Sequence, residues 1–176
     1  TFTSSMLLEE RNLIEMAKYK IPDVFSSDMQ PIELLALLQH HGIPTRLLDV
    51  TESALVALYF ACCSLPDKDG EVFAFKNNEY QIANSPIINA IADSYRFSIG
   101  DNYTLSQFYS AVKVQPYFLE QVFLLGLCNQ SDVEGEEWVE ECCENPIFVF
   151  APVHSLRQRV QRGRYILFHD EIVTRW

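Results

Sequence analysis

ELLALLQHHGIPTRLLDVTESALVALYFAC, residues 33 to 62, is the stretch that decides the fold of this chain. It opens with a leucine-rich segment between Pro31 and Gly42, which predicts a largely buried helix. Residues 43–51 then place polar side chains between leucines, which predicts an extended, buried connector. The last segment, Ala54 to Cys63, is apolar on every face, so we expect a helix that runs through the core.

Outside this stretch, helical spacing of apolar residues and turn-forming residues predict the remaining elements. We expect helices at residues 7–20, 86–95, 105–112 and 117–127, and strands at residues 72–75, 147–150 and 165–168. Helices early in the chain and strands spread through the later part favour an α+β fold. We therefore expect a helix-rich first part packed on a small, mainly antiparallel sheet, in a single domain over residues 1–176.

The charge balance limits the kinds of partner. The chain has 24 acidic and 13 basic residues, a formal charge of -11, which disfavours nucleic acid as a partner. Four of the arginines lie between Arg157 and Arg164, where they either face a ligand or form a solvated surface. Neither a membrane-spanning apolar run nor a signal peptide is present in the sequence, so we expect a cytoplasmic protein.

The cysteines indicate neither a disulfide framework nor a zinc site. Five cysteines occur as two adjacent pairs and a single residue, without CxxC spacing. Adjacent cysteines point apart on a helix or strand, so a pair cannot easily supply two ligands to one metal ion. We expect reduced thiols and no metal.

The polar residues of the deciding stretch are the first candidates for chemistry. Residues 39–49 bring together His40, His41, Arg46 and Asp49 among apolar neighbours, and buried charges need partners. Arg46 and Asp49, three residues apart, either form a structural ion pair or bind a carboxylate or phosphate of a ligand. Of the two histidines, His40 is the better candidate for a site residue.

The run QHHGIPTRLLDVTESALVALYFA, residues 39–61, resembles the pattern QHyGlPTRLLDwT followed by LvALyFA, which is typical of the bacterial FRG domain family. His41 replaces the usual tyrosine, Val50 the usual tryptophan and Ala54 a common proline. The name-giving Phe/Tyr-Arg-Gly tripeptide does not occur in the sequence, and the first residue is Thr1. We expect the tripeptide to lie upstream, so that this chain is an N-terminally truncated FRG domain.

A second block near the C-terminus carries the same resemblance. Arg157, Gln161, Gly163 and Tyr165 are similar to the closing Arg, Gln, Gly and aromatic residue of the family. The order of these blocks is similar to that of ADP-ribosyltransferases, which implies a fold of that type. It also implies a nucleotide-handling enzyme with NAD as its substrate, in a toxin or phage-defence context.

The resemblance assigns roles residue by residue. Thr51 and Ser53 would bracket the nicotinamide, Tyr59 would stack on its ring, and Gln161 or Glu171 would lie near the ribose. Breaking the N-glycosidic bond needs a carboxylate or amide beside an oxocarbenium-like centre. The candidate catalytic residues are then Gln161, Thr51 and His40, and the candidate substrate-binding residues are Arg46, Asp49, Ser53, Tyr59 and Arg157.

Each of these residues also has a structural interpretation. Ser53 is a natural helix N-cap, Thr51 is its neighbour in a turn, and Tyr59 suits a core. In that case the domain is a non-catalytic module that binds a protein partner, and its polar motif holds the fold. The two hypotheses differ in whether Arg46, His40 and Gln161 converge on one water-accessible cleft or are each satisfied internally.

Overall fold

The computed structural model describes residues 4–25, 29–63, 67–76, 81–82, 85–97, 103–124, 131–143, 146–150 and 159–169. Its helices are α1 (Ser4–Lys20), α2 (Pro31–His40), α3 (Ala54–Cys63), α4 (Pro86–Ala92), α5 (Ser94–Phe97), α6 (Leu105–Val112), α7 (Pro116–Leu124) and α8 (Asp132–Cys142). Its strands are β1 (Leu47–Thr51), β2 (Gln81–Ile82), β3 (Ile147–Phe150) and β4 (Gly163–Leu167). The α+β class predicted from the sequence is confirmed.

The four described strands form one small sheet in the order β1-β4-β3-β2. The late strand β4 is central and pairs antiparallel with both β1 and β3, while the two-residue β2 is parallel to β3. Leu47 of β1 and Ile147 of β3 both lie opposite Leu167 of β4. The expected small, mainly antiparallel sheet is therefore confirmed, and it joins the deciding stretch to the end of the chain.

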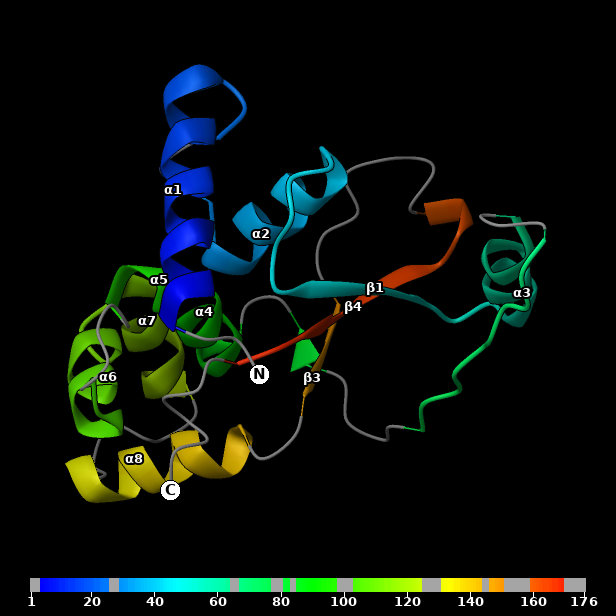
Figure 1. Cartoon of the computed structure of the whole chain (residues 1–176). Coiled ribbons are helices and arrows are strands. Elements are labelled where there is room, and N and C mark those ends of the chain that lie inside the picture. Colours follow the sequence, from blue (N-terminus) through cyan, green and yellow to red (C-terminus); the bar gives the residue numbers. More distant parts are fainter. Residues whose placement is uncertain are drawn as a thin grey trace.

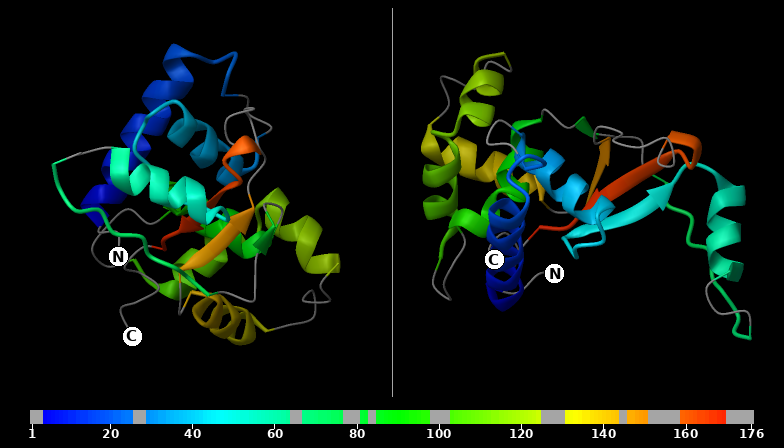
Figure 2. Two further views of the ribbon diagram at one scale, coloured as in Figure 1. Left: turned by 90° about the vertical axis from the view of Figure 1, so that its right-hand side faces the viewer. Right: turned by 90° about the horizontal axis from the view of Figure 1, so that it is seen from above.

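The core lies between one end of the sheet and the helices other than α3. Figures 1 and 2 show α1, α2 and α4 to α8 gathered at that end, while α3 stands alone at the far end of β1. Helix α2 is central to the core, with six of its ten residues buried. Those residues are Ile32, Leu34, Leu35, Ala36, Leu37 and Leu38. They explain why this leucine-rich segment forms a stable helix.

Local chemistry sets the ends of several helices. Pro31 occupies the first turn of α2, and the backbone N–H of Gln30 donates to the carboxylate of Glu33 at 3.3 Å. Beyond α2, Gly42 has a φ of +76°, a left-handed conformation that a side chain would strain. The amide of Ile43 then donates to the carbonyl of Leu38 at 3.0 Å, which closes the helix.

Three sequence-based expectations differ from the structure. Helix α3 has the predicted bounds, but none of its ten residues is buried, so it does not run through the core. Residues 72–75 are exposed and form no strand, since they lie along the outside of α3's end of the molecule rather than in the sheet. The predicted helix 86–95 is divided at Asp93 into α4 and α5.

Several other elements have the bounds that the sequence predicts. The predicted helix 105–112 and strand 147–150 have the observed bounds of α6 and β3. The second half of the expected connector, residues 47–51, is the strand β1. Among the described residues no helix is both long and apolar enough to cross a bilayer.

Candidate ligand-binding cleft

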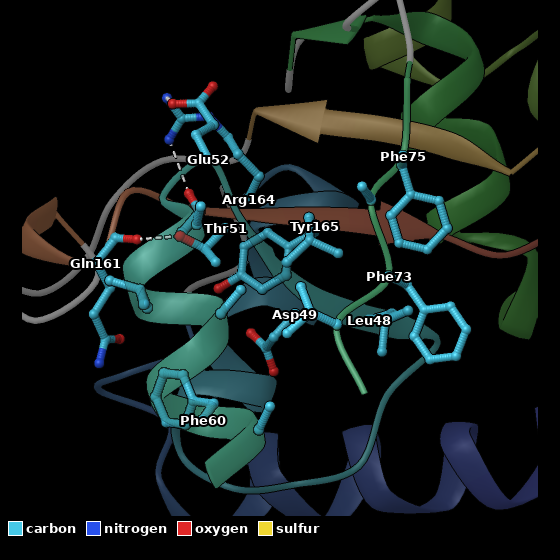
Figure 3. Close-up of a pocket in the computed structure, with 18 of the residues that line it drawn as sticks. Leu48, Asp49, Thr51, Glu52, Phe60, Phe73, Phe75, Gln161, Arg164 and Tyr165 are labelled. Carbon is cyan, nitrogen blue, oxygen red and sulfur yellow. Dashed lines mark hydrogen bonds and ion pairs between the residues drawn. The ribbon is translucent and has the colours of Figure 1, made fainter. Parts of the chain in front are cut away.

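A cleft of about 1040 Å³ lies between α3 and the sheet. Its walls are β1, the inner side of α3, the extended segment 71–75, and parts of β3 and β4. Figure 3 shows side chains of β1, α3, the segment 71–75 and β4 in this region. The cleft exists because α3 touches the rest of the molecule mainly through β1 and leaves the adjacent sheet surface uncovered.

Four of the predicted site residues line this cleft. They are His40, Asp49, Thr51 and Gln161. Strand pairing brings them together, because Thr51 lies opposite Gly163, and Gln161 precedes β4 by one turn. The side chain of Thr51 donates a hydrogen bond of 2.6 Å to the carbonyl oxygen of Gln161 (Figure 3). Residues 110 positions apart in sequence are thus joined at the rim.

The QHHGIPTRLLD motif orients Asp49 through a short chain of hydrogen bonds. Thr45 Oγ1 donates to Gln39 Oε1 at 3.0 Å, and Gln39 Nε2 donates to Asp49 Oδ2 at 2.9 Å. The backbone N–H of Leu47 in turn donates to Thr45 Oγ1 at 3.2 Å. These contacts connect the end of α2 to β1 and hold the Asp49 carboxylate at the cleft.

The remaining candidates lie elsewhere. Ser53 is the N-cap of α3, where its hydroxyl accepts a long hydrogen bond of 3.5 Å from the Val56 amide, and it does not line the cleft. Tyr59 is 62% exposed on the outer side of α3, so it belongs neither to the core nor to the cleft wall. Arg157 lies outside the described residues.

Arg46 is buried away from the cleft, with 1% of its surface exposed. Its Nε lies 2.9 Å from Glu10 Oε2, so its ionic partner is Glu10 of α1 rather than Asp49. Its two terminal nitrogens donate to Ser94 Oγ at 2.6 Å and to the carbonyl of Ala92 at 3.1 Å. The guanidinium therefore joins α1, β1 and the α4–α5 junction, and of the expected trio only His40 and Gln161 meet at the cleft.

A second buried polar group stands beside this junction. Asp93 is 2% exposed, and its Oδ2 accepts hydrogen bonds from Arg96 at 2.9 Å and Tyr117 at 3.0 Å. Burial raises the pKa of Asp93 from 3.8 to about 6, against the opposing effect of Arg96. Burial and the neighbouring Asp93 also raise the pKa of Tyr117. The group holds α5 to α7 and does not line the cleft.

Sequence reasoning missed Glu52, Phe73 and Phe75 of the cleft, and it named Arg164 only as one of four clustered arginines. Glu52 and Arg164 form an ion pair of 3.1 Å at its rim, and the Arg164 guanidinium also lies 4.3 Å from the centre of the Phe150 ring. Phe73 and Phe75 close another side. The alternation Val-Phe-Ala-Phe at residues 72–75 is the signal that could have drawn attention to them, but it resembles a strand in the sequence.

The deciding stretch lies within a match to a known protein family. The family profile described as FRG domain matches residues 3–70. Residues 3–70 are an FRG domain. No curated protein and no solved structure matches the chain.

The FRG domain match ends in the turn that follows α3. It therefore includes His40, Asp49 and Thr51 but excludes Gln161 and the segment 71–75. The cleft is closed by residues on both sides of this boundary. Among the described residues no group of three or more His, Cys, Asp or Glu side chains is arranged to hold a metal ion.

Proposed function

We propose that the cleft binds a nucleotide of the NAD type and that the protein transfers the ADP-ribose group of this nucleotide to an acceptor or to water. The observation that carries the proposal is the meeting of His40, Asp49, Thr51 and Gln161 at one open cleft. Convergent polar groups over an otherwise apolar pocket are the usual form of a small-molecule site. The resemblance to ADP-ribosyltransferases supplies the substrate class.

The wall residues suit the two ends of such a ligand differently. The interior of the cleft is aromatic and apolar, which suits a flat base or a nicotinamide ring. Two exposed arginines lie close to Gln161 in the sequence, Arg159 two residues before it and Arg162 directly after it, where a phosphate group could pair with them. Arg162 has a φ of 49°, a conformation that is uncommon for a residue with a side chain and is often found at functional sites.

The proposed chemistry uses the polar residues in distinct roles. Asp49 would stabilise the positive charge that develops on the ribose as its bond to nicotinamide breaks. His40 would receive the proton of the acceptor, either water or a hydroxyl. Thr51 holds the backbone of Gln161 by its 2.6 Å hydrogen bond, so it would act by positioning the Gln161 amide beside the ribose.

Calorimetric titration with NAD tests this proposal, together with an assay for released nicotinamide. We expect Gln161→Ala to weaken NAD binding by about tenfold, the usual effect of losing one hydrogen bond to a ligand. Asn12→Ala is the matched control, because it removes an exposed amide from α1, which contributes nothing to the cleft. Equal NAD binding by the two variants, or no heat with the unmodified protein, would contradict the proposal.

A second candidate function follows from the outer face of α3. Leu55, Leu58, Tyr59 and Cys62 recur at helical spacing, and the first three are 79%, 54% and 62% exposed. An apolar face of this kind is unusual on a soluble domain and is typical of a protein-binding surface. This observation favours the alternative hypothesis of an interaction module.

The surroundings of α3 indicate the chemistry of such a partner. The turn that follows α3 is acidic, with exposed Asp67, Asp69 and Glu71 against a single Lys68. Gly70 lies against the carbonyl of Ala61, which keeps this turn beside the helix. A basic amphipathic helix complements both the apolar face and its acidic border. A helical Leu/Lys peptide should therefore bind, and Leu58→Gln should abolish its binding, whereas binding of a Leu/Glu peptide would contradict this assignment.

A further inference from the structure

The cleft is lined by aromatic side chains from several separate segments. They are Phe60 of α3, Phe73 and Phe75 of the extended segment, Phe148 of β3 and Tyr165 of β4. The rings of Phe75 and Phe148 meet edge to face with centroids 6.0 Å apart. Phe73 and Phe75 are 68% and 57% exposed, so these two rings present free surface to an incoming ligand. Aromatic faces attract cations as well as other rings.

The charges of the cleft favour a cation. Among the described residues, three carboxylates, those of Asp49, Glu52 and Glu71, line it together with one guanidinium, that of Arg164. Arg164 is already engaged by Glu52 at 3.1 Å and by the carbonyl of Gly163 at 2.8 Å. The described lining thus carries more negative than positive charge, and its arginine is occupied by a carboxylate of the same cleft.

Asp49 is the carboxylate best placed to act on a ligand ring. Its Oδ2 accepts a hydrogen bond from the neutral amide of Gln39, which orients the group without neutralising it. Among the described residues no cation forms an ion pair with it. Asp49 lies opposite Tyr165 in the β1–β4 register, and Figure 3 shows its carboxylate beside the Tyr165 ring. Strand alternation places Asp49 and Tyr165 on one face of the sheet, and Phe148, with Phe75 against it, on the other. A planar ring placed against Tyr165 would therefore have the carboxylate close to it.

We propose that this cleft selects its ligand by the charge of an aromatic ring, binding a cationic ring against Asp49 in preference to the same ring without charge. The inference rests on the proposed function in so far as the ring is the nicotinamide of NAD, which is a cationic pyridinium. The reduced form of the same nucleotide carries an uncharged dihydropyridine ring. The cleft therefore distinguishes the oxidised from the reduced nucleotide, and the nicotinamide ring, not the adenine, lies beside Asp49 and Tyr165.

Two matched pairs of probes test the selection on the whole chain. The first pair is 1-methylnicotinamide, a cation, and nicotinamide, which is neutral; the second is NAD and its reduced form, NADH. Exposed cation–π contacts and exposed ion pairs are each modest, so we expect a preference of about tenfold for the cation in both pairs. The preference should shrink as salt concentration rises, because exposed charges are screened.

Variants assign the preference to the carboxylate. Asp49→Asn keeps the shape of the side chain and its ability to accept from Gln39, so the fold should be retained. We expect this variant to bind both members of each pair equally and to melt at the temperature of the unmodified protein. Asp23→Asn is the control, because Asp23 is exposed beyond α1 and does not line the cleft. It should retain the tenfold preference.

The outcomes separate this inference from the proposed function. Equal binding of NAD and NADH would overturn charge selection while nucleotide binding stands. A preference for 1-methylnicotinamide without any binding of NAD would support charge selection and overturn the nucleotide assignment. A preference that survives Asp49→Asn would overturn the role of Asp49, and failure of all four probes to bind would overturn both proposals.

Discussion

Helices α2 and α3 have the same length of ten residues, similar apolar sequences and opposite surroundings. In α2 six residues are buried, and in α3, which is the more uniformly apolar, none is buried. The difference comes from position: α2 packs against α4 and β1, whereas α3 contacts the rest of the molecule mainly through β1. An apolar helix sequence predicts that the helix is buried against other residues, but the tertiary structure decides whether the same chain supplies those residues.

The two helices also divide the polar residues of the deciding stretch. On the α2 side, Arg46 is buried and paired with Glu10 of α1. On the α3 side, Asp49 and Thr51 line the cleft. Structural and candidate functional residues thus alternate along one motif, and only their surroundings distinguish them.

The largest effect is expected on the α2 side, at Arg46. Arg46→Ala would leave Glu10 as an unpaired charge in the core, which costs about 3–5 kcal/mol of unfolding free energy in comparable sites. Urea denaturation measures the loss, and Arg11→Ala, at an exposed position of α1, is the control. A loss below about 1 kcal/mol, the usual worth of an exposed pair, would show that the pair is not buried in solution.

Truncating one leucine in each helix tests the comparison directly. Leu35 of α2 has no exposed surface, so Leu35→Ala should destabilise the protein by about 2–5 kcal/mol. Leu58 of α3 is 54% exposed, and Leu58→Ala should change stability by only about 0.5 kcal/mol. Chemical denaturation measures both. A similar large loss for the two variants would mean that α3 is covered in solution.

Asp93 gives the α2 side a pH dependence. Its folded pKa of about 6 lies above the ordinary 3.8, so its contribution to stability is complete below 3.8 and is lost as pH rises through 6. The loss amounts to at most about 3 kcal/mol. Thermal melts between pH 4 and 7 should show this decline in the unmodified protein and a flatter profile in Asp93→Asn. A decline that persists in Asp93→Asn would assign it to other groups.

On the α2 side, the smallest effect is expected where the helix ends. Gly42→Ala would place a side chain at a φ of +76°, a strain of about 1–2 kcal/mol. Gly42→Asn should lose less, since asparagine tolerates the left-handed conformation. Equilibrium unfolding of both variants checks the order. Equal stability of all three proteins would show that the helix end rearranges, and that the path from α2 to β1 is less fixed than the structure indicates.

Much of the fold followed from local sequence chemistry. The spacing of leucines, Pro31 and Gly42 located α2, and a short apolar run located β3, because helix ends and strand patterns are written in neighbouring residues. Local sequence chemistry gave a wrong prediction for residues 72–75, because the alternation of aromatic and small side chains produces a strand only if a partner strand is available. The match to the FRG domain family likewise covers one continuous stretch, residues 3–70.

The sequence by itself determined the fold class, the family and most of the helix positions. Only the tertiary structure decided that Arg46 pairs with Glu10, that Thr51 reaches Gln161, and that α3 remains exposed. The first two features are contacts between residues that are far apart in the sequence, by 36 positions in one case and by 110 in the other. No local pattern encodes such contacts. Burial is a property of the whole packed chain, and it separated the arginine that holds the fold from the carboxylate that faces the cleft.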